Sequence, residues 1–303
     1  MKIQIKTHAI LLYSSLGLAI LWGPTASADP VDAVADLVLG QPNSTSNTAN
    51  NGGVSASSLH GPRKVAVNAA GNVYVADTAN HRVLVYLDPQ NTDTVADLVL
   101  GKLNFSTSKR KKDFVGNKVV SASTLYFPFG IAVDAVGNVY VADTGNNRVL
   151  VYLDPQNTDT VADLVLGQPN FTSRTANTGG VNARSLHAPH GVAVDTAGNV
   201  YVADLLNNRV LEYHTPLTTD TVADVVLGQP NSTSNTANNG GVSASSLFSS
   251  REVAMDAAGN VYVADTGNNR VLVYLDPKNT DTVADLVLGQ PNFTSRTANT
   301  GGV

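Results

Sequence analysis

The chain has 303 residues, with 19 lysines and arginines against 24 aspartates and glutamates, so its formal net charge is −5. A mildly acidic chain with scattered charges is a poor candidate for binding nucleic acid, which is dominated by cationic contacts to phosphate. The sequence contains no cysteine, which excludes disulfides, thiolate nucleophiles and cysteine-ligated zinc. The fold must therefore be stabilised by its packed core.

The first 28 residues have the features of a secretory signal peptide. Lys2 and Lys6 form a basic start, residues 9–22 carry no charge and are largely apolar, and Ala26-Ser27-Ala28 offers a cleavage site. An uncleaved anchor is the alternative, but the run is short for a membrane span of roughly 20 residues. We expect a secreted or periplasmic protein of residues 29–303, with no membrane insertion after cleavage. Loss of the two lysines takes the formal charge from −5 to −7.

Two motifs recur along the rest of the chain. Gly-Asn-Val-Tyr-Val-Ala-Asp begins at Gly71, Gly137, Gly198 and Gly259, and Ala-Asp-Leu/Val-Val-Leu-Gly begins at Ala35, Ala96, Ala162, Ala223 and Ala284. Residues 139–181 and 261–303 are identical except that Gln156 is replaced by Lys278. The motifs define repeat units of approximately 41–101, 102–167, 168–228 and 229–289, with a partial unit at 290–303.

Within a unit the periodicity is that of β-strands. In the third unit we expect strands at 191–195, 200–203, 209–213 and 221–227, separated by turns and a polar loop at 205–208. Each unit therefore predicts a four-stranded antiparallel sheet, and radial repetition of such sheets gives a β-propeller. A loop of roughly 20 residues, rich in Asn, Ser, Thr and Gly, leads to the next unit, and we expect it to be ordered on one face.

These residues resemble a known repeat family. The run from Gly191 to Asp195, the motif from Gly198 to Asp204, and the Asn207 and Arg209 that follow are similar to the NHL repeat. The first unit contains the letters Asn80-His81-Arg82. The Val-Leu-Gly-Gln-Pro-Asn extension resembles that of NHL-repeat proteins exported by bacteria. The resemblance implies an all-β propeller of four-stranded antiparallel blades, but the family includes binding modules, sensors and enzymes, so it implies no single function.

The number of blades departs from the family pattern of about six. We expect four complete blades with orphan terminal strands, one at Val34 to Leu39 and another, with a loop, before Val303. Three interpretations remain open. The chain is a fragment of a larger propeller, or four blades close with spare ends, or copies form an oligomer through the orphan strands.

The repeated polar residues predict structure rather than catalysis. An Asp ends the second strand of every unit and an Arg begins the third, so identical residues are spread around a ring instead of converging on one point. We expect each Asp to cap its loop and pair with its own Arg. The first strands are apolar at their centres and offer no carboxylate, amide or imidazole to a metal. We therefore predict no catalytic residues, no metal and no cofactor.

Variation between the units points to a ligand site. The loop that enters each first strand lies on the same face of a propeller as the loop between the second and third strands, so its residues should crowd the channel mouth. Aromatic, imidazole and charged side chains at a concave channel mouth are suited to binding a ligand. The alternative interpretation is that these residues differ through sequence drift at exposed loop ends. The candidate residues are His60, Arg63, Tyr126, Phe129, His187, His190, Phe248, Arg251 and Glu252.

The spacing of His187 and His190 occurs in some metal sites, but Pro189 interrupts it and no carboxylate motif follows. We expect an exported binding or scaffolding module that holds a protein, peptide or glycan at its loop-rich face. A metal-dependent lyase or lactonase that uses the propeller channel is one alternative. A structural envelope protein without a discrete site is another.

Overall fold

A computed structural model describes residues 35–109 and 119–298 of the chain. The predicted signal peptide lies outside the described residues. The chain divides into an N-terminal unit, residues 1–36, and a second unit, residues 37–303, which contains every sheet. Within the described ranges, no helix has both the length and the apolar character that crossing a bilayer requires.

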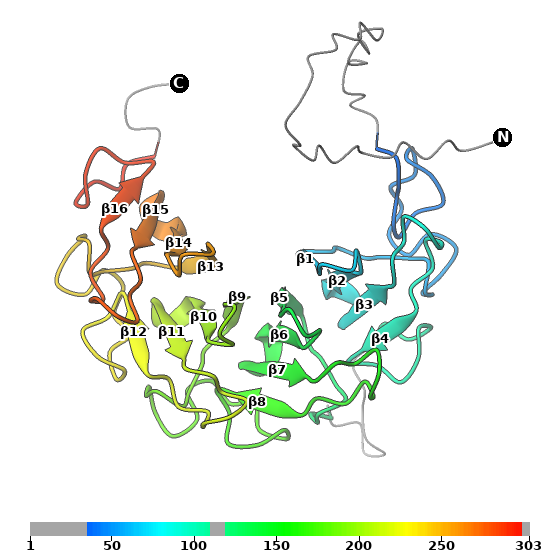
Figure 1. The fold of residues 1–303 in the computed structure, drawn as a ribbon, viewed down its shortest axis with the longest axis horizontal. Helices are drawn as coiled ribbons and strands as arrows, with labels where there is room; N and C mark the ends of the chain where they lie inside the picture. The colour runs from blue at the N-terminus through cyan, green and yellow to red at the C-terminus, as the bar shows by residue number, and fades with distance from the viewer. Residues whose placement is uncertain (1–34, 110–118, 299–303) are drawn as a thin grey trace, which may run out of the picture. The chain divides into compact units, whose positions relative to one another are not determined.

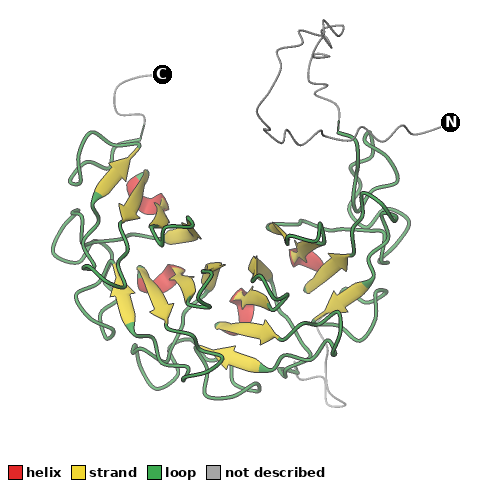
Figure 2. Cartoon of the chain, viewed as in Figure 1, coloured by secondary structure: helices red, strands yellow, loops and turns green. Residues whose placement is uncertain are grey.

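The described part of the second unit contains four antiparallel sheets of four strands, which are the blades of a β-propeller (Figures 1 and 2). This confirms the fold class predicted from the sequence. The first blade contains β1 (Val65–Val67), β2 (Val73–Asp77), β3 (Arg82–Tyr86) and β4 (Leu98–Leu100). The second contains β5 (Pro128–Val133), β6 (Val139–Asp143), β7 (Arg148–Tyr152) and β8 (Leu164–Leu166). The third contains β9 (Pro189–Val194), β10 (Val200–Asp204), β11 (Arg209–Tyr213) and β12 (Val225–Leu227), and the fourth β13 (Ser250–Met255), β14 (Val261–Asp265), β15 (Arg270–Tyr274) and β16 (Leu286–Leu288).

Short polar side chains build the hairpin between the first two strands of each blade. In the second blade, Asp134 Oδ1 accepts hydrogen bonds from the backbone N–H groups of Val136 (3.1 Å) and Asn138 (2.8 Å). Gly137 has a φ of 97°, a left-handed conformation that costs glycine little. The repeated Asp/Asn-x-x-Gly-Asn sequence therefore specifies a tight turn, as the sequence analysis expected.

A single 3₁₀ turn, and not an irregular loop, joins the second and third strands of each blade. These turns are η1 (Thr78–Asn80), η2 (Thr144–Asn146), η3 (Leu205–Asn207) and η4 (Thr266–Asn268). The residue that follows each turn is left-handed, with φ of 57° at His81 and 55° at Asn147. Asn tolerates this conformation better than most side chains, which explains its recurrence there.

Three details of the strand prediction were wrong. The fourth strand of the third blade begins at Val225 and not at Thr221, because Asp224 Oδ2 instead accepts the backbone N–H of His214 (2.7 Å). The predicted orphan strand near the C-terminus is β16, which pairs with β15 and completes the fourth blade. At the N-terminal end, residues 35–39 form no strand.

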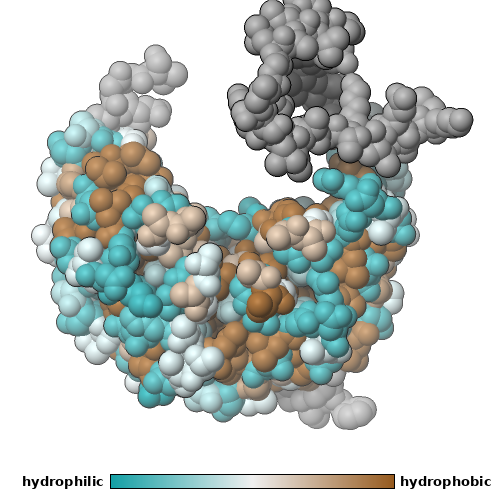
Figure 3. All heavy atoms as spheres, in the orientation of Figure 1, coloured by the Kyte–Doolittle hydropathy of each residue, from teal (hydrophilic) through white to brown (hydrophobic). Residues whose placement is uncertain are grey.

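Neighbouring blades bury their apolar faces against each other. Tyr140 and Val149 of the second blade, for example, pack in one core with Leu186, Val192 and Val200 of the third. The first strands lie next to one another in the order β1, β5, β9 and β13, toward the centre of Figure 1. On the face seen in Figure 3, hydrophobic residues emerge in patches between hydrophilic ones.

Glycine sets how closely the inner strands approach. A Cβ atom at Gly130 would lie 2.2 Å from the carbonyl oxygen of His190, and one at Gly191 would lie 2.8 Å from Cα of Glu252. Any side chain at either position would force neighbouring blades apart. In the repeat, these two glycines correspond to Lys64 in the first blade and to Glu252 in the fourth.

Candidate ligand-binding site

In every blade, a buried polar network links the second and third strands to the loops before and after the blade. In the second blade, Arg148 Nε donates to Asp143 Oδ2 (2.8 Å), and Nη2 donates to the carbonyl oxygens of Ser121 (2.9 Å) and Thr124 (2.8 Å). Nη1 donates to the carbonyl oxygen of Phe171 (2.5 Å). Both charged side chains are fully buried and all four blades repeat the arrangement. The structural role predicted for the Asp and Arg residues is confirmed.

The same Asp carboxylates fix the entry to each first strand. Asp143 Oδ1 accepts the backbone N–H of Tyr126 (2.7 Å), and His60, His187 and Phe248 are held in the same way in their own blades. These four predicted site residues are therefore positioned by their backbones, one in each blade. The structure does not gather their side chains into one cluster.

The other predicted residues do meet. The rings of Phe129, on β5, and His190, on β9, lie 4.3 Å apart between centroids. The Arg63 guanidinium carbon lies 5.6 Å from the centroid of the Phe129 ring, which is the geometry of a cation–π contact. Side chains of three different types, from the same repeat position of three blades, thus converge at the entry to the first strands.

The fourth blade reaches this cluster through an ion pair. Lys64 Nζ donates a hydrogen bond to Glu252 Oε2 (3.0 Å), and both side chains are partly exposed. Glu252 is adjacent to Arg251 at the start of β13, as Lys64 is adjacent to Arg63 before β1. Glu252 is among the residues predicted from the sequence, whereas Lys64 is not.

His190 lies at the centre of these groups. Burial lowers the pKa of His190, Glu252 opposes that effect, and the charges of Arg251 and Arg63 lower the pKa further. Its Nδ1 atom is buried and has no hydrogen-bond partner among the described residues. The imidazole thus lies near two guanidinium groups, whose charges disfavour its protonated form.

We call Arg63, Phe129, His190 and Arg251, with the Lys64–Glu252 pair, the mouth cluster. Beside it lies an aromatic trio that the sequence analysis only partly identified. The His81 ring is 5.0 Å from Tyr126 and 4.5 Å from Phe127, and the two latter rings are 4.8 Å apart. Phe127 is 39% exposed and has a φ of 49°.

Comparison of the units could have revealed the two members of the trio that were missed. The other units have Gly61, Ala188 and Ser249 in place of Phe127, and Asn147, Asn208 and Asn269 in place of His81. A bulky side chain is therefore present at a left-handed position that small residues occupy elsewhere.

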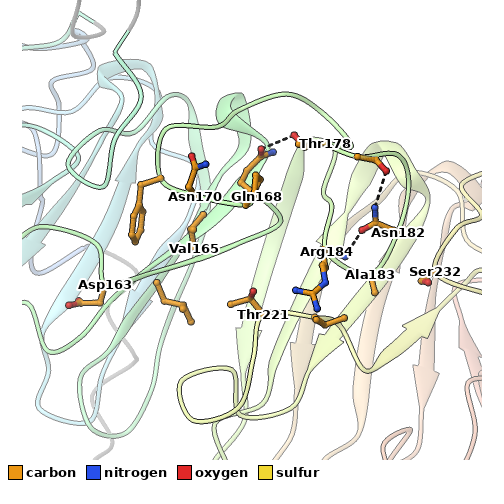
Figure 4. Close-up of a pocket in the computed structure, with 15 residues that line it drawn as sticks. Asp163, Val165, Gln168, Asn170, Thr178, Asn182, Ala183, Arg184, Thr221 and Ser232 are labelled. Atoms are coloured by element: carbon orange, nitrogen blue, oxygen red, sulfur yellow. Dashed lines mark hydrogen bonds between the residues drawn. The ribbon is translucent and has the colours of Figure 1, made fainter.

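A larger groove lies at the outer side of the second and third blades (Figure 4). It has a volume of about 980 Å³ and is lined by residues 163–165, 168–171, 178–179, 182–184, 221–222 and 232. Gln168 Oε1 accepts a hydrogen bond from the Thr178 hydroxyl (2.9 Å), which closes one rim. Most of the lining recurs in every unit, but Arg184 stands where the other units have serine.

The interface between the third and fourth blades contains a cluster of ionisable side chains. Glu212 is fully buried at a position where the other blades have Val85, Val151 and Val273. Its Oε1 accepts the hydroxyl of Tyr201 (2.9 Å) and lies 2.9 Å from His214 Nε2. Burial raises the pKa of Glu212, and the contacts with Tyr201, His214 and Lys278 oppose that rise.

Nothing in this geometry assembles a metal site. Across residues 35–109 and 119–298, no three His, Asp or Glu side chains are grouped so that they could bind one ion. The exposed side chains of β1 are apolar, with Val65 54% and Val67 60% exposed. The arrangement of the mouth cluster instead suits recognition, because it combines aromatic surface with cationic hydrogen-bond donors.

The NHL repeat family matches four segments of the chain, residues 59–86, 125–152, 186–213 and 252–274. The first three segments begin at the entry to the first strand and the fourth begins within β13, and all four end with the third strand. The chain is an NHL-repeat protein. Among curated proteins, no sequence matches it.

Solved structures similar to this NHL-repeat chain include two lyases. Virginiamycin B lyase from Staphylococcus aureus has 12% identity and a TM-score of 0.41, with 79% of this chain and 59% of that chain covered. A streptogramin B lyase has 10% identity and a TM-score of 0.44, with 78% and 59% covered. Kuenenia stuttgartiensis hydrazine synthase has 12% identity and a TM-score of 0.44, with 71% and 45% covered. The NHL-repeat chain thus spans less than two thirds of the length of these structures.

Proposed function

We propose that this NHL-repeat protein is an exported binding module, which holds a protein, peptide or glycan ligand at the mouth cluster. The observation that supports the proposal is the convergence of Arg63, Phe129, His190 and the Lys64–Glu252 pair, contributed by all four blades. Several of the residues that differ between units meet at this place, while the repeated Asp–Arg pairs serve the scaffold. Binding sites need this asymmetry, whereas a purely structural array does not.

A lyase or lactonase is the competing proposal. It requires a general acid, base or metal ligand set in the channel, and the exposed side chains of β1, Val65 and Val67, supply none of these groups. Native mass spectrometry of the full chain separates the two proposals. A stoichiometric metal ion would favour the enzyme, and a metal-free chain that captures ligand without turnover would favour the binding module.

The binding test uses glycan and peptide arrays with the purified chain. We expect at least one ligand class to bind the wild type and to bind the triple variant Arg63→Ala/His190→Ala/Arg251→Ala at least about tenfold more weakly. The matched control is Arg184→Ala, which removes an exposed arginine from the outer groove. Equal capture by the wild type and the triple variant would contradict a site at the mouth cluster and favour the structural role.

A further inference from the structure

The mouth cluster has unused positive charge. Arg63 and Arg251 are exposed, and neither guanidinium donates a hydrogen bond to any residue in the described part of the chain. Glu252, the carboxylate that belongs to the cluster, is already paired with Lys64. Two free guanidiniums beside a neutralised carboxylate make this site cationic, although the whole chain has a net charge of −5.

The arrangement of these donors favours a carboxylate. A guanidinium presents parallel N–H groups that match the two oxygens of a carboxylate, and such charge-assisted pairs are stronger than neutral hydrogen bonds. His190 lies near both guanidiniums, whose charges help burial to lower the pKa of its imidazole. Its Nδ1 atom is buried, so the two exposed guanidiniums are the donors that a ligand carboxylate can reach.

The aromatic trio adds a second kind of surface. Phe127 and Phe129 are two residues apart, so their backbones lie within about 7 Å of each other. Phe127 keeps an exposed ring at the cost of a left-handed backbone conformation. Strain of this kind persists where the surrounding structure enforces it, and it is concentrated at functional sites. An exposed, flat aromatic surface offers a stacking face to a flat, partly apolar ring.

From these two surfaces together we infer that the ligand is an acidic carbohydrate. A sugar ring would stack on the exposed ring of Phe127 while its carboxylate binds Arg63 and Arg251. This inference rests on the proposed binding function and names the ligand class for the same site. An acidic peptide would use the cations but would not need Phe127.

The test measures calorimetric binding of three probes to the full chain. The probes are tetragalacturonate, its methyl ester, in which every carboxylate is neutral, and tetraglutamate. We expect tetragalacturonate to bind at least about tenfold more tightly than the ester. Arg63→Gln and Arg251→Gln should each weaken acid binding about tenfold and leave ester binding unchanged, and Arg184→Gln should change neither.

A Phe127→Gly variant tests the aromatic surface, and the first unit already has Gly61 at this left-handed position. The melting temperature checks that the variant keeps its fold, because glycine adopts this conformation at little cost. We expect weaker binding of both the acid and the ester, because both would lose the stacking surface. Unchanged sugar binding in this variant would overturn the stacking role.

The remaining outcomes separate this inference from the proposed function. Equal binding of the acid and the ester, or binding of tetraglutamate alone, would overturn the inference that the ligand is an acidic carbohydrate. If the probe that binds is lost in Arg63→Gln, the result would still support a ligand site at the mouth cluster. If no probe binds but the arrays find a ligand that depends on the cluster, only the carbohydrate inference fails. If the arrays also find none, both fail.

Discussion

Lys64 and Glu252, which are 188 residues apart in the chain, form a hydrogen-bonded ion pair of 3.0 Å between the first and fourth blades. At the corresponding position the two middle blades have Gly130 and Gly191, against which the next blade packs directly. The first and fourth blades carry a lysine and a glutamate at that position instead. A side-chain ion pair therefore links these two blades.

We expect Glu252→Gln to strengthen binding of tetragalacturonate, because it frees the Lys64 ammonium for the ligand carboxylate. The gain should be lost in the double variant Lys64→Gln/Glu252→Gln, which removes the freed cation. Since both side chains are partly exposed, the free energy of unfolding should change by less than about 1 kcal/mol in either variant. Weaker binding by Glu252→Gln would show that the glutamate itself contacts the ligand.

Arg148→Met should destabilise the protein by about 3–5 kcal/mol, because it leaves the buried Asp143 carboxylate without its cation. It also leaves the carbonyl oxygens of Ser121, Thr124 and Phe171 without their donor. Urea denaturation followed by circular dichroism measures the loss. Arg184→Met, at an exposed position, is the control and should change stability by less than about 0.5 kcal/mol.

Glu212→Val should stabilise the protein at neutral pH, by about 1–4 kcal/mol, since valine fills the same position in the other three blades. The Tyr201 hydroxyl would need a new partner, and Asp195 corresponds to the Asp134 that binds Tyr140 in the second blade (3.2 Å). The free energies of unfolding of the wild type and the variant, measured by urea titration, give the difference.

The stability difference should also depend on pH. Burial raises the pKa of Glu212 in the folded state, so the folded protein retains this proton at pH values where the unfolded chain has lost it. The wild type should therefore lose stability relative to Glu212→Val as the pH rises from the ordinary glutamate pKa through the raised one, and the two should converge below that window. A difference independent of pH would place its origin in packing and not in ionisation.

Gly130→Ala should lower the melting temperature, because its methyl group would meet the His190 carbonyl oxygen at 2.2 Å. The expected loss is about 1–3 kcal/mol, typical of overpacking, and differential scanning calorimetry would measure it. Lys64→Ala is the matched control, because the first blade already accommodates a side chain at that position. Equal stability of Gly130→Ala and wild type would mean that β5 and β9 can separate without cost.

The repeat made most of the fold predictable. The Gly-Asn-Val-Tyr-Val-Ala-Asp motif located the second strand of every blade, and the Asp and Arg at its end were correctly interpreted as one structural pair. Strand limits were less certain at the fourth strand, because Thr221 to Asp224 continue the apolar pattern while tertiary hydrogen bonds hold them outside the sheet. The local pattern cannot show which partner a backbone group finds.

The sequence predicted the candidate site only as a set of positions at which the residue type differs between the repeat units. Differences between the units identified Arg63, Phe129 and His190, and the structure brings them together. The partnership of Lys64 with Glu252 depends on the curvature of successive blades, which no local sequence feature encodes. The role of His190 was also hidden, because its free nitrogen and lowered pKa result from burial by neighbouring blades.

Each buried arginine also links the loops on its two sides. Arg148 binds the carbonyl oxygens of Ser121 and Thr124 before its blade and that of Phe171 after it. When force is applied to the two ends of the chain, neither loop can extend until the hydrogen bonds of this guanidinium break. Gly198 and Gly259, at equivalent places in two repeats, are 61 residues apart. A stretched molecule should therefore lengthen in sudden steps of about 200 Å, one for each arginine that releases its loops.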